Sequence, residues 1–285
     1  MSAMTPGPAG RARPLVIAHR GASERIPEHT LAAYTRAIED GADGLEADVR
    51  LTADGHLVCV HDRTINRTSN GAGVLSTLEL ADLQSLDFGG WQPGSDTAEL
   101  PDQVSADRSE VLTLERLLEL VVDSPRLVQL MVETKHPTRY AGLVERTLVE
   151  LLRRFGLDGW VPTEEARVTV MSFSELALRR VRRLTPGVPL VLLMERIPVS
   201  YRSGMLPKGV RVSGPSIDVV RMHPRYVKRV HNAGSRVFVW TVDDADDVAM
   251  LCDLGVDAII TNRPHDVIAE VDRITGGTAA ERTGD

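Results

Sequence analysis

The chain has 285 residues, of which 42% are hydrophobic and 26% are charged, as in a globular protein that buries a sizeable core. Its 33 basic and 40 acidic residues give a formal net charge of −7, which argues against nucleic acid or an anionic membrane as the default partner. An anionic substrate would therefore need a local cationic site.

The two ends of the chain, residues 1–13 and 276–285, have the small, polar composition of disordered segments. Neither the apolar core of a signal peptide nor a run of about 20 apolar residues is present, so we expect a soluble, cytoplasmic protein. Cys59 and Cys252 lie within apolar runs and are expected to be buried free thiols.

Between these ends, residues 14–275 alternate short apolar strands with helical patterns. The predicted strands cover residues 15–19, 45–49, 127–134, 167–172, 189–194, 210–214, 236–242 and 257–261. The predicted helices cover residues 30–40, 113–122, 140–155, 174–184, 224–233, 245–254 and 264–274. Several strands are continuous apolar runs, which is typical of a parallel sheet buried on both faces.

Eight such strands followed by helices predict one α/β domain, a (β/α)8 TIM barrel. A doubly wound sheet is disfavoured because no GxGxxG motif follows the first strand. Residues 55–110 break the alternation with turn-rich sequence and one short helical pattern. We expect a small insertion after the second strand, beside the barrel mouth, where long insertions tend to cover active sites.

Ionisable residues end the first three predicted strands. His19 and Arg20 end the first strand, and Glu46 and Asp48 lie two residues apart on the second, so that both point to one side. The third strand ends in a second such pair, Glu133 and Lys135. Each group alone has a structural interpretation, as a solvated strand face or a surface ion pair. Their joint occurrence at the carboxyl ends of barrel strands favours an active site.

Glu46, Asp48 and Glu133 would supply three carboxylates from adjacent strands, which suits a hard divalent cation, Mg²⁺ or Ca²⁺. Without a cation, close carboxylates repel and raise one another's pKa. Arg20 and Lys135 add positive charge at the same mouth, as a phosphate group requires.

His61 follows another apolar run and could bring a second imidazole towards His19. Two histidines on either side of a phosphorus atom can act as general base and general acid, although His61 could also be a structural turn residue. Glu28 could instead serve the start of the first helix, Trp240 could belong to the barrel core, and Asn262 could be a turn residue before a proline.

Taken together, the motifs H-R-G-A-S, P-E-H-T, L-E-A-D-V, V-C-V-H-D, R-T-S-N-G-A-G, V-E-T-K, W-T-V-D and T-N-R-P resemble the glycerophosphodiester phosphodiesterases. The resemblance runs from about Pro14 to Asp266. It implies a TIM barrel and metal-dependent hydrolysis of a small-molecule glycerophosphodiester to sn-glycerol 3-phosphate and an alcohol. Attack by water and attack by the glycerol 2-hydroxyl both stay open, and so does a homo-oligomer.

The resemblance also implies roles for individual residues. These are metal ligands at Glu46, Asp48 and Glu133, an acid/base pair at His19 and His61, phosphate contacts at Arg20 and Lys135, a further site residue at Glu28, and a wall of the glycerol pocket at Trp240. We favour His61 as the acid that protonates the leaving alcohol. The chain departs from the family's usual residues at His29, where asparagine is usual, and at Asn262, where aspartate is more frequent. His29 is otherwise expected to be a surface or structural residue.

Two alternatives remain at this point. A sphingomyelinase D-like or lysophospholipase D-like lipid phosphodiesterase would share the barrel and both histidines, but it would need an apolar channel. The insertion offers few apolar candidates for a lid, namely Leu75, Leu78, Leu80, Leu83, Phe88 and Trp91. A non-catalytic barrel that binds glycerol phosphate is the other alternative, and the full set of histidines and carboxylates argues against it.

Overall fold

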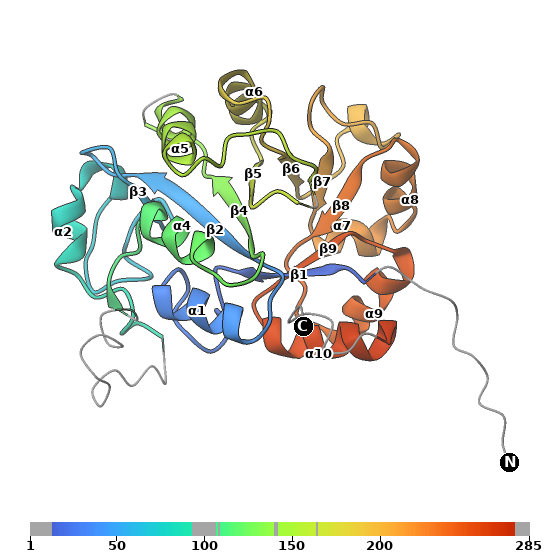
Figure 1. Cartoon of the computed structure of the whole chain (residues 1–285), viewed down its shortest axis with the longest axis horizontal. Coiled ribbons are helices and arrows are strands. Elements are labelled where there is room, and N and C mark those ends of the chain that lie inside the picture. The colour runs from blue at the N-terminus through green and yellow to red at the C-terminus, as the bar shows by residue number, and fades with distance from the viewer. Residues whose placement is uncertain (1–12, 93–106, 108, 140–141, 164, 277–285) are drawn as a thin grey trace, which may run out of the picture.

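A closed parallel barrel surrounded by helices forms the computed structural model, which describes residues 13–92, 107, 109–139, 142–163 and 165–276 (Figure 1). The strands follow one another in the order β1-β9-β8-β7-β6-β5-β4-β2, and β1 also pairs with β2, which closes the barrel. The predicted TIM barrel is thereby confirmed.

Eight parallel strands of the described residues make the barrel. They are β1 Leu15–His19, β2 Gly44–Leu51, β4 Gln129–Thr134, β5 Val168–Ser172, β6 Leu190–Met194, β7 Val212–Pro215, β8 Arg236–Val239 and β9 Ala258–Thr261. The additional strand β3, Leu57–Cys59, pairs antiparallel with β2 at the start of the insertion.

The helices lie around the barrel and in the insertion. They are α1 Leu31–Glu39, α2 Leu80–Gln84, α4 Leu114–Val122, α5 Leu143–Arg154, α6 Glu175–Leu184, α7 Ile217–Met222, α8 Arg225–Asn232, α9 Ala245–Leu254 and α10 Pro264–Thr275, with short 3-10 turns η1 Leu75–Thr77 and η2 Val199–Tyr201. Helix α7 was not predicted from the sequence. Between β6 and β7 the chain forms only η2 and no α-helix, and no helix was predicted there.

Alternation along the strands decides which side chains reach the barrel interior. In β2, Leu45, Ala47 and Val49 belong to the large core between the strands and the helices. Glu46 and Asp48, at the intervening positions, therefore point to the opposite side, into the barrel. In β1 the same period places Ile17 in the core inside the barrel. His19, two residues later, lies on the same side at the carboxyl end of the strand.

The barrel interior is closed by apolar side chains beneath the mouth. These are Ile17, Met131, Met171, Val191, Leu193, Val212, Phe238, Ala258 and Ile260. Because the interior is packed, ligands have access only from the end at which the polar side chains gather.

The insertion has a small hydrophobic core of its own. It comprises Val58, Val60, Ile65, Leu75, Leu83, Phe88 and Val111, with Leu78 and Leu80 packed against it. Most of the apolar side chains considered as lid candidates therefore pack in the core of the insertion. Residues 93–106 and 108 of the predicted insertion lie outside the described residues.

The turn after β1 depends on a glycine. Arg20 and Gly21 have φ values of 60° and 87°, in the left-handed region. A Cβ atom on Gly21 would lie 2.6 Å from the carbonyl carbon of Ala33 in α1. The glycine therefore lets this turn pack directly against α1 while Arg20 faces the barrel mouth.

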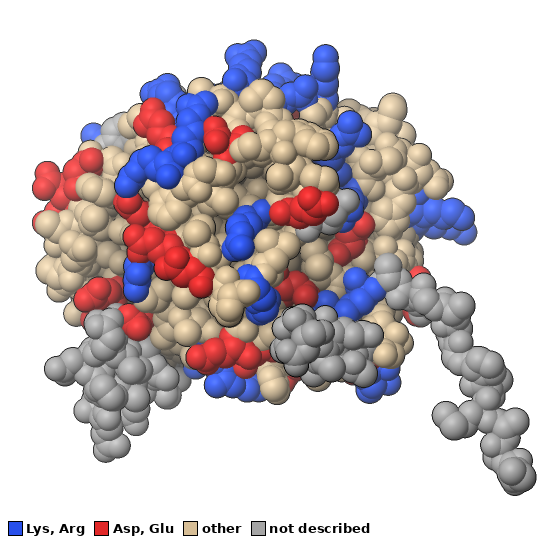
Figure 2. Space-filling model, in the orientation of Figure 1, with Lys and Arg blue, Asp and Glu red and all other residues tan. Residues whose placement is uncertain are grey.

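Cys59 and Cys252 are buried free thiols, as predicted. The predicted disordered ends fall mostly outside the described residues, although Arg13 is described and forms ion pairs with Asp43 and Asp272. No helix in the described part of the chain has the length and apolar character needed to cross a membrane. Basic and acidic side chains are interspersed over the face shown in Figure 2.

Candidate active site

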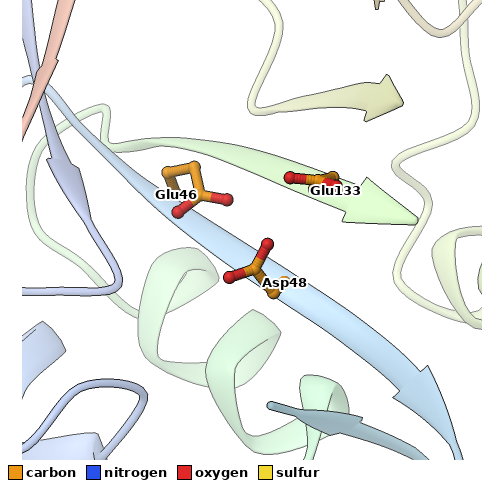
Figure 3. Close-up of side chains that lie close together, drawn as sticks. All are labelled: Glu46, Asp48 and Glu133. Atoms are coloured by element: carbon orange, nitrogen blue, oxygen red, sulfur yellow. The ribbon is translucent and has the colours of Figure 1, made fainter. Parts of the chain in front are cut away.

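Three carboxylates lie close together on the neighbouring strands β2 and β4 (Figure 3). Strand register places Asp48 opposite Glu133, and Glu46 is two residues earlier on β2. One oxygen from each carboxylate lies within 4.8 Å of the other two, and all three side chains are buried. The predicted carboxylate cluster therefore exists as a compact group.

Burial makes the charges of this cluster costly. It raises the pKa of Glu46 well above its ordinary value, and the nearby Asp48 raises it further. It also raises the pKa of Glu133 to about 8, again with a contribution from Asp48. Burial acts on Asp48 in the same direction, but the hydrogen bond from His29 and the charge of Arg20 hold its pKa well below the usual range.

Two cations lie against the carboxylates, as the sequence predicts. Lys135 Nζ is 3.1 Å from Asp48 Oδ1 and 2.9 Å from Glu133 Oε1. Arg20 Nε is 2.9 Å from Asp48 Oδ2, although this contact lacks hydrogen-bond geometry. Oε2 of Glu46 is buried and has no hydrogen-bond partner in the described part of the chain.

His19 is oriented by an amide. Its Nδ1 lies 2.7 Å from Oδ1 of Asn262, whose Nδ2 donates to Asp243 at 2.6 Å. Because Asp243 fixes which end of the amide faces the ring, Nδ1 of His19 carries the hydrogen and Nε2 is left as an acceptor. Burial, with the charge of Arg20 next, lowers the pKa of His19 to about 4.

His61 is oriented by a carboxylate instead. Its Nδ1 lies 2.6 Å from Asp62 Oδ1, and Arg50 donates two hydrogen bonds, of 2.9 and 2.7 Å, to its carbonyl oxygen. Burial lowers the pKa of His61, while Asp48 and the hydrogen bond to Asp62 oppose that shift. The partner of His19 is thus a neutral amide, whereas the partner of His61 is an anionic carboxylate.

Arg67, from the insertion, joins two parts of the site and was missed in the sequence. It donates to Glu28 at 2.7 and 2.9 Å and to Asp62 at 2.7 Å, and its guanidinium lies 5.7 Å from the ring centre of Trp91. Glu28 also accepts from Arg20 at 3.1 Å. Glu28 is not among the residues that line the pocket at the barrel mouth, which is described below. It contacts Arg20 and thereby supports the position of that side chain.

The Arg67 contacts predict an acid-dependent loss of stability. Against the effect of burial, they help to lower the pKa of Glu28 and of Asp62 to about 2. A depressed folded pKa gives stability that is present above the unfolded value and lost as the pH falls towards 2. Urea unfolding between pH 5 and pH 2 should therefore show a smaller loss for Arg67→Gln than for wild type. Arg116→Gln, at an exposed position of α4, is the matched control, and equal slopes for all three proteins would contradict the prediction.

A pocket of about 230 Å³ opens above the carboxylates. It is lined by His19, Arg20, Glu46, His61, Glu133, Lys135, Met171, Phe173, Leu193, Glu195, Trp240, Thr241 and Ile260. Trp240 donates from Nε1 to the carbonyl of Gly214 at 2.7 Å and meets Phe173 edge to face, with ring centres 5.4 Å apart. These two rings make one wall of the pocket apolar.

His29 is a buried support of the cluster, so the surface alternative for this residue is wrong. Its Nε2 lies 3.0 Å from Asp48 Oδ2 and its Nδ1 lies 2.8 Å from the hydroxyl of Tyr34. That hydroxyl donates to the carbonyl of Glu46 at 3.0 Å. The His29 ring therefore ties α1 to β2 directly beneath the carboxylates.

Comparison with known proteins gives consistent matches. The model of the "Glycerophosphoryl diester phosphodiesterase family" matches residues 19–266. A "Probable glycerophosphodiester phosphodiesterase 1" of Mycobacterium tuberculosis is 46% identical over 251 residues, covering 88% of this chain and 90% of that protein. A "Glycerophosphodiester phosphodiesterase" of Caldanaerobacter subterraneus is 33% identical and covers 89% of this chain and 96% of its own length.

Solved structures agree with these matches. A phosphodiesterase of Oleispira antarctica, in complex with the product sn-glycerol-3-phosphate, superposes with a TM-score of 0.77 at 25% identity. The superposition covers 91% of this chain and 97% of the other.

Proposed function

Because the chain belongs to the glycerophosphoryl diester phosphodiesterase family and is a glycerophosphodiester phosphodiesterase, we propose that its barrel mouth uses a divalent cation and two histidines for this hydrolysis. The products would be sn-glycerol 3-phosphate, which the Oleispira antarctica structure binds, and an alcohol. The observation that carries the proposal is the buried carboxylate cluster of Glu46, Asp48 and Glu133 at a pocket that two anchored imidazoles also line.

The cluster fits a hard cation. Three carboxylate oxygens within 4.8 Å of one another are the donor type that Mg²⁺ and Ca²⁺ prefer. The buried Oε2 of Glu46, which has no hydrogen-bond partner among the described residues, would also gain a ligand in the cation. When bound, the cation would neutralise phosphoryl charge as a Lewis acid.

Arg20 and Lys135 would bind the diester phosphate. Both line the pocket and both are held by site carboxylates. Lys135 keeps its charge, because Asp48 and Glu133 raise its pKa against the effect of burial. Fixed cations of this kind stabilise negative charge that develops in the transition state.

The partners of the two imidazoles support one assignment of the proton transfers. His19, with its pKa lowered to about 4 and its Nε2 unprotonated, removes the proton from the attacking oxygen, which belongs to water or to the glycerol 2-hydroxyl. The attacking oxygen then bonds to phosphorus as the bond from phosphorus to the alcohol oxygen breaks. His61 acts in its doubly protonated form, which Asp62 at Nδ1 and the charge of Asp48 favour against the effect of burial, and it donates the Nε2 proton to that leaving oxygen. After attack by the 2-hydroxyl, water opens the resulting cyclic phosphate in a second displacement to give sn-glycerol 3-phosphate. Trp240 and Phe173 would pack against the glycerol carbons.

Metal removal and replacement test this proposal. Glycerophosphodiester hydrolysis is expected to fall after treatment with EDTA and to return on addition of Mg²⁺, Ca²⁺ or Mn²⁺, because the carboxylates alone repel an anionic substrate. A circular dichroism spectrum of the treated protein checks that the fold is retained. Full activity in EDTA would contradict the assignment of the carboxylates as metal ligands.

A further inference from the structure

A second pocket, of about 410 Å³, lies beside the mouth between β2, the insertion and the loop before α5. We call it the arginine pocket. It is lined by Arg50, Leu51, Arg63, Val74, Leu75, Ser76, Thr77, Lys135, Pro137, Thr138, Arg139 and Val144. Its size is within the range of pockets that hold small organic ligands.

The lining is cationic. Arg50, Arg63, Arg139 and Lys135 contribute to it, and it contains no carboxylate among the described residues. Arg63 is exposed and has no side-chain hydrogen bond or ion pair within the described residues. Arg50 donates from Nε and Nη2 to the carbonyl of His61, which leaves Nη1 available to a ligand. These donors of Arg50 and Arg63 line a concave site, and such an arrangement favours an anion.

The arginine pocket adjoins the candidate active site on the side of Lys135 and His61. Lys135 lines both pockets, and Arg50 holds the backbone of His61, which lines the mouth pocket. In the proposed mechanism, His61 protonates the leaving oxygen, so the alcohol departs on this side. An alcohol attached to the phosphate at the mouth would therefore extend towards Arg50 and Arg63.

We propose that the arginine pocket binds the alcohol half of the diester and selects alcohols that carry a phosphate monoester. This inference rests on the proposed function, because it needs the reacting phosphate at the mouth. Arginine binds phosphate oxygens through paired N–H donors, whereas a cationic headgroup such as choline would be repelled. Leu51, Val74 and Val144 would contact the carbon skeleton of the alcohol.

Two substrates that differ by one phosphate group test the inference. Wild type is expected to show a higher kcat/KM for glycerophosphoinositol 4-phosphate than for glycerophosphoinositol. Arg63→Gln should lower the value for the phosphorylated substrate about tenfold, through loss of one charged contact, and change the other less than about twofold. Arg116→Gln removes an equal charge from an exposed position of α4 and should change neither value.

Product inhibition gives a second readout. Inositol 4-phosphate should inhibit hydrolysis of glycerophosphoinositol by wild type more strongly than by Arg63→Gln. The pocket assignment is overturned if wild type shows no preference between the two substrates or if Arg63→Gln loses the same factor on both. Absence of turnover of both substrates by wild type would instead count against the proposed function, so the two failures are distinguishable.

Discussion

Glu46→Gln is expected to lower kcat for glycerophosphodiester hydrolysis by about 10³-fold, roughly 4 kcal/mol of lost transition-state stabilisation, without unfolding the protein. The amide keeps the shape of the side chain but removes the negative charge that would hold the cation. It also removes the buried oxygen that has no partner among the described residues. The measurement is kcat with saturating Mg²⁺, Ca²⁺ or Mn²⁺, together with the free energy of cation binding by calorimetry.

The same substitution is expected to preserve or increase stability in EDTA. The folded pKa of Glu46 lies above its ordinary value, so ionisation of Glu46 weakens the wild-type fold as the pH rises. The glutamine side chain of the variant does not ionise, and the difference in unfolding free energy should grow with pH in favour of the variant. Such gains are expected where a site keeps costly charges for function. Glu150→Gln, on an exposed position of α5, is the control, and undiminished activity of Glu46→Gln would contradict the metal-ligand assignment.

The strand-end residues could be predicted because the period of a strand is fixed. Once LEADV is recognised as a barrel strand, apolar Leu45 and Ala47 determine that Glu46 and Asp48 face inward. Parallel strands end at the same edge, so Glu133 on the next barrel strand had to lie beside them. This part of the site follows from local pattern and topology alone.

The supports of these residues could not be predicted in the same way, because each depends on loop geometry. His29 reaches Asp48 from a left-handed turn, with φ 62°, that the sequence does not mark with glycine or asparagine. Asn262 reads as a turn residue until Asp243 is seen to orient its amide towards His19. Arg67 is 39 residues from its partner Glu28, in an insertion with its own core.

We expect these supports to give the two imidazoles opposite roles in proton transfer, and His61→Ala tests the difference. Hydrolysis of glycerophosphocholine by the variant is expected to fall by about 10²- to 10⁴-fold, the usual contribution of a general acid. Choline is a poor leaving group because its alkoxide is strongly basic, so its departure needs the proton that His61 donates. The measurement is kcat/KM at neutral pH, where neutral His19 can still act as base.

A diester with a nitrophenol leaving group separates the acid from the base. Nitrophenolate is a weak base and leaves without a proton, so His61→Ala should retain most of its activity on this substrate. His19→Ala is the matched variant, and it should lose activity on both substrates because removal of the nucleophile's proton is needed in either case. Asp62 holds the His61 ring and Asn262 holds the His19 ring, each through Nδ1. Replacing one histidine by alanine therefore leaves the partner of the other histidine in place. Equal losses on the two substrates for His61→Ala would show that His61 acts by some means other than protonating the leaving oxygen.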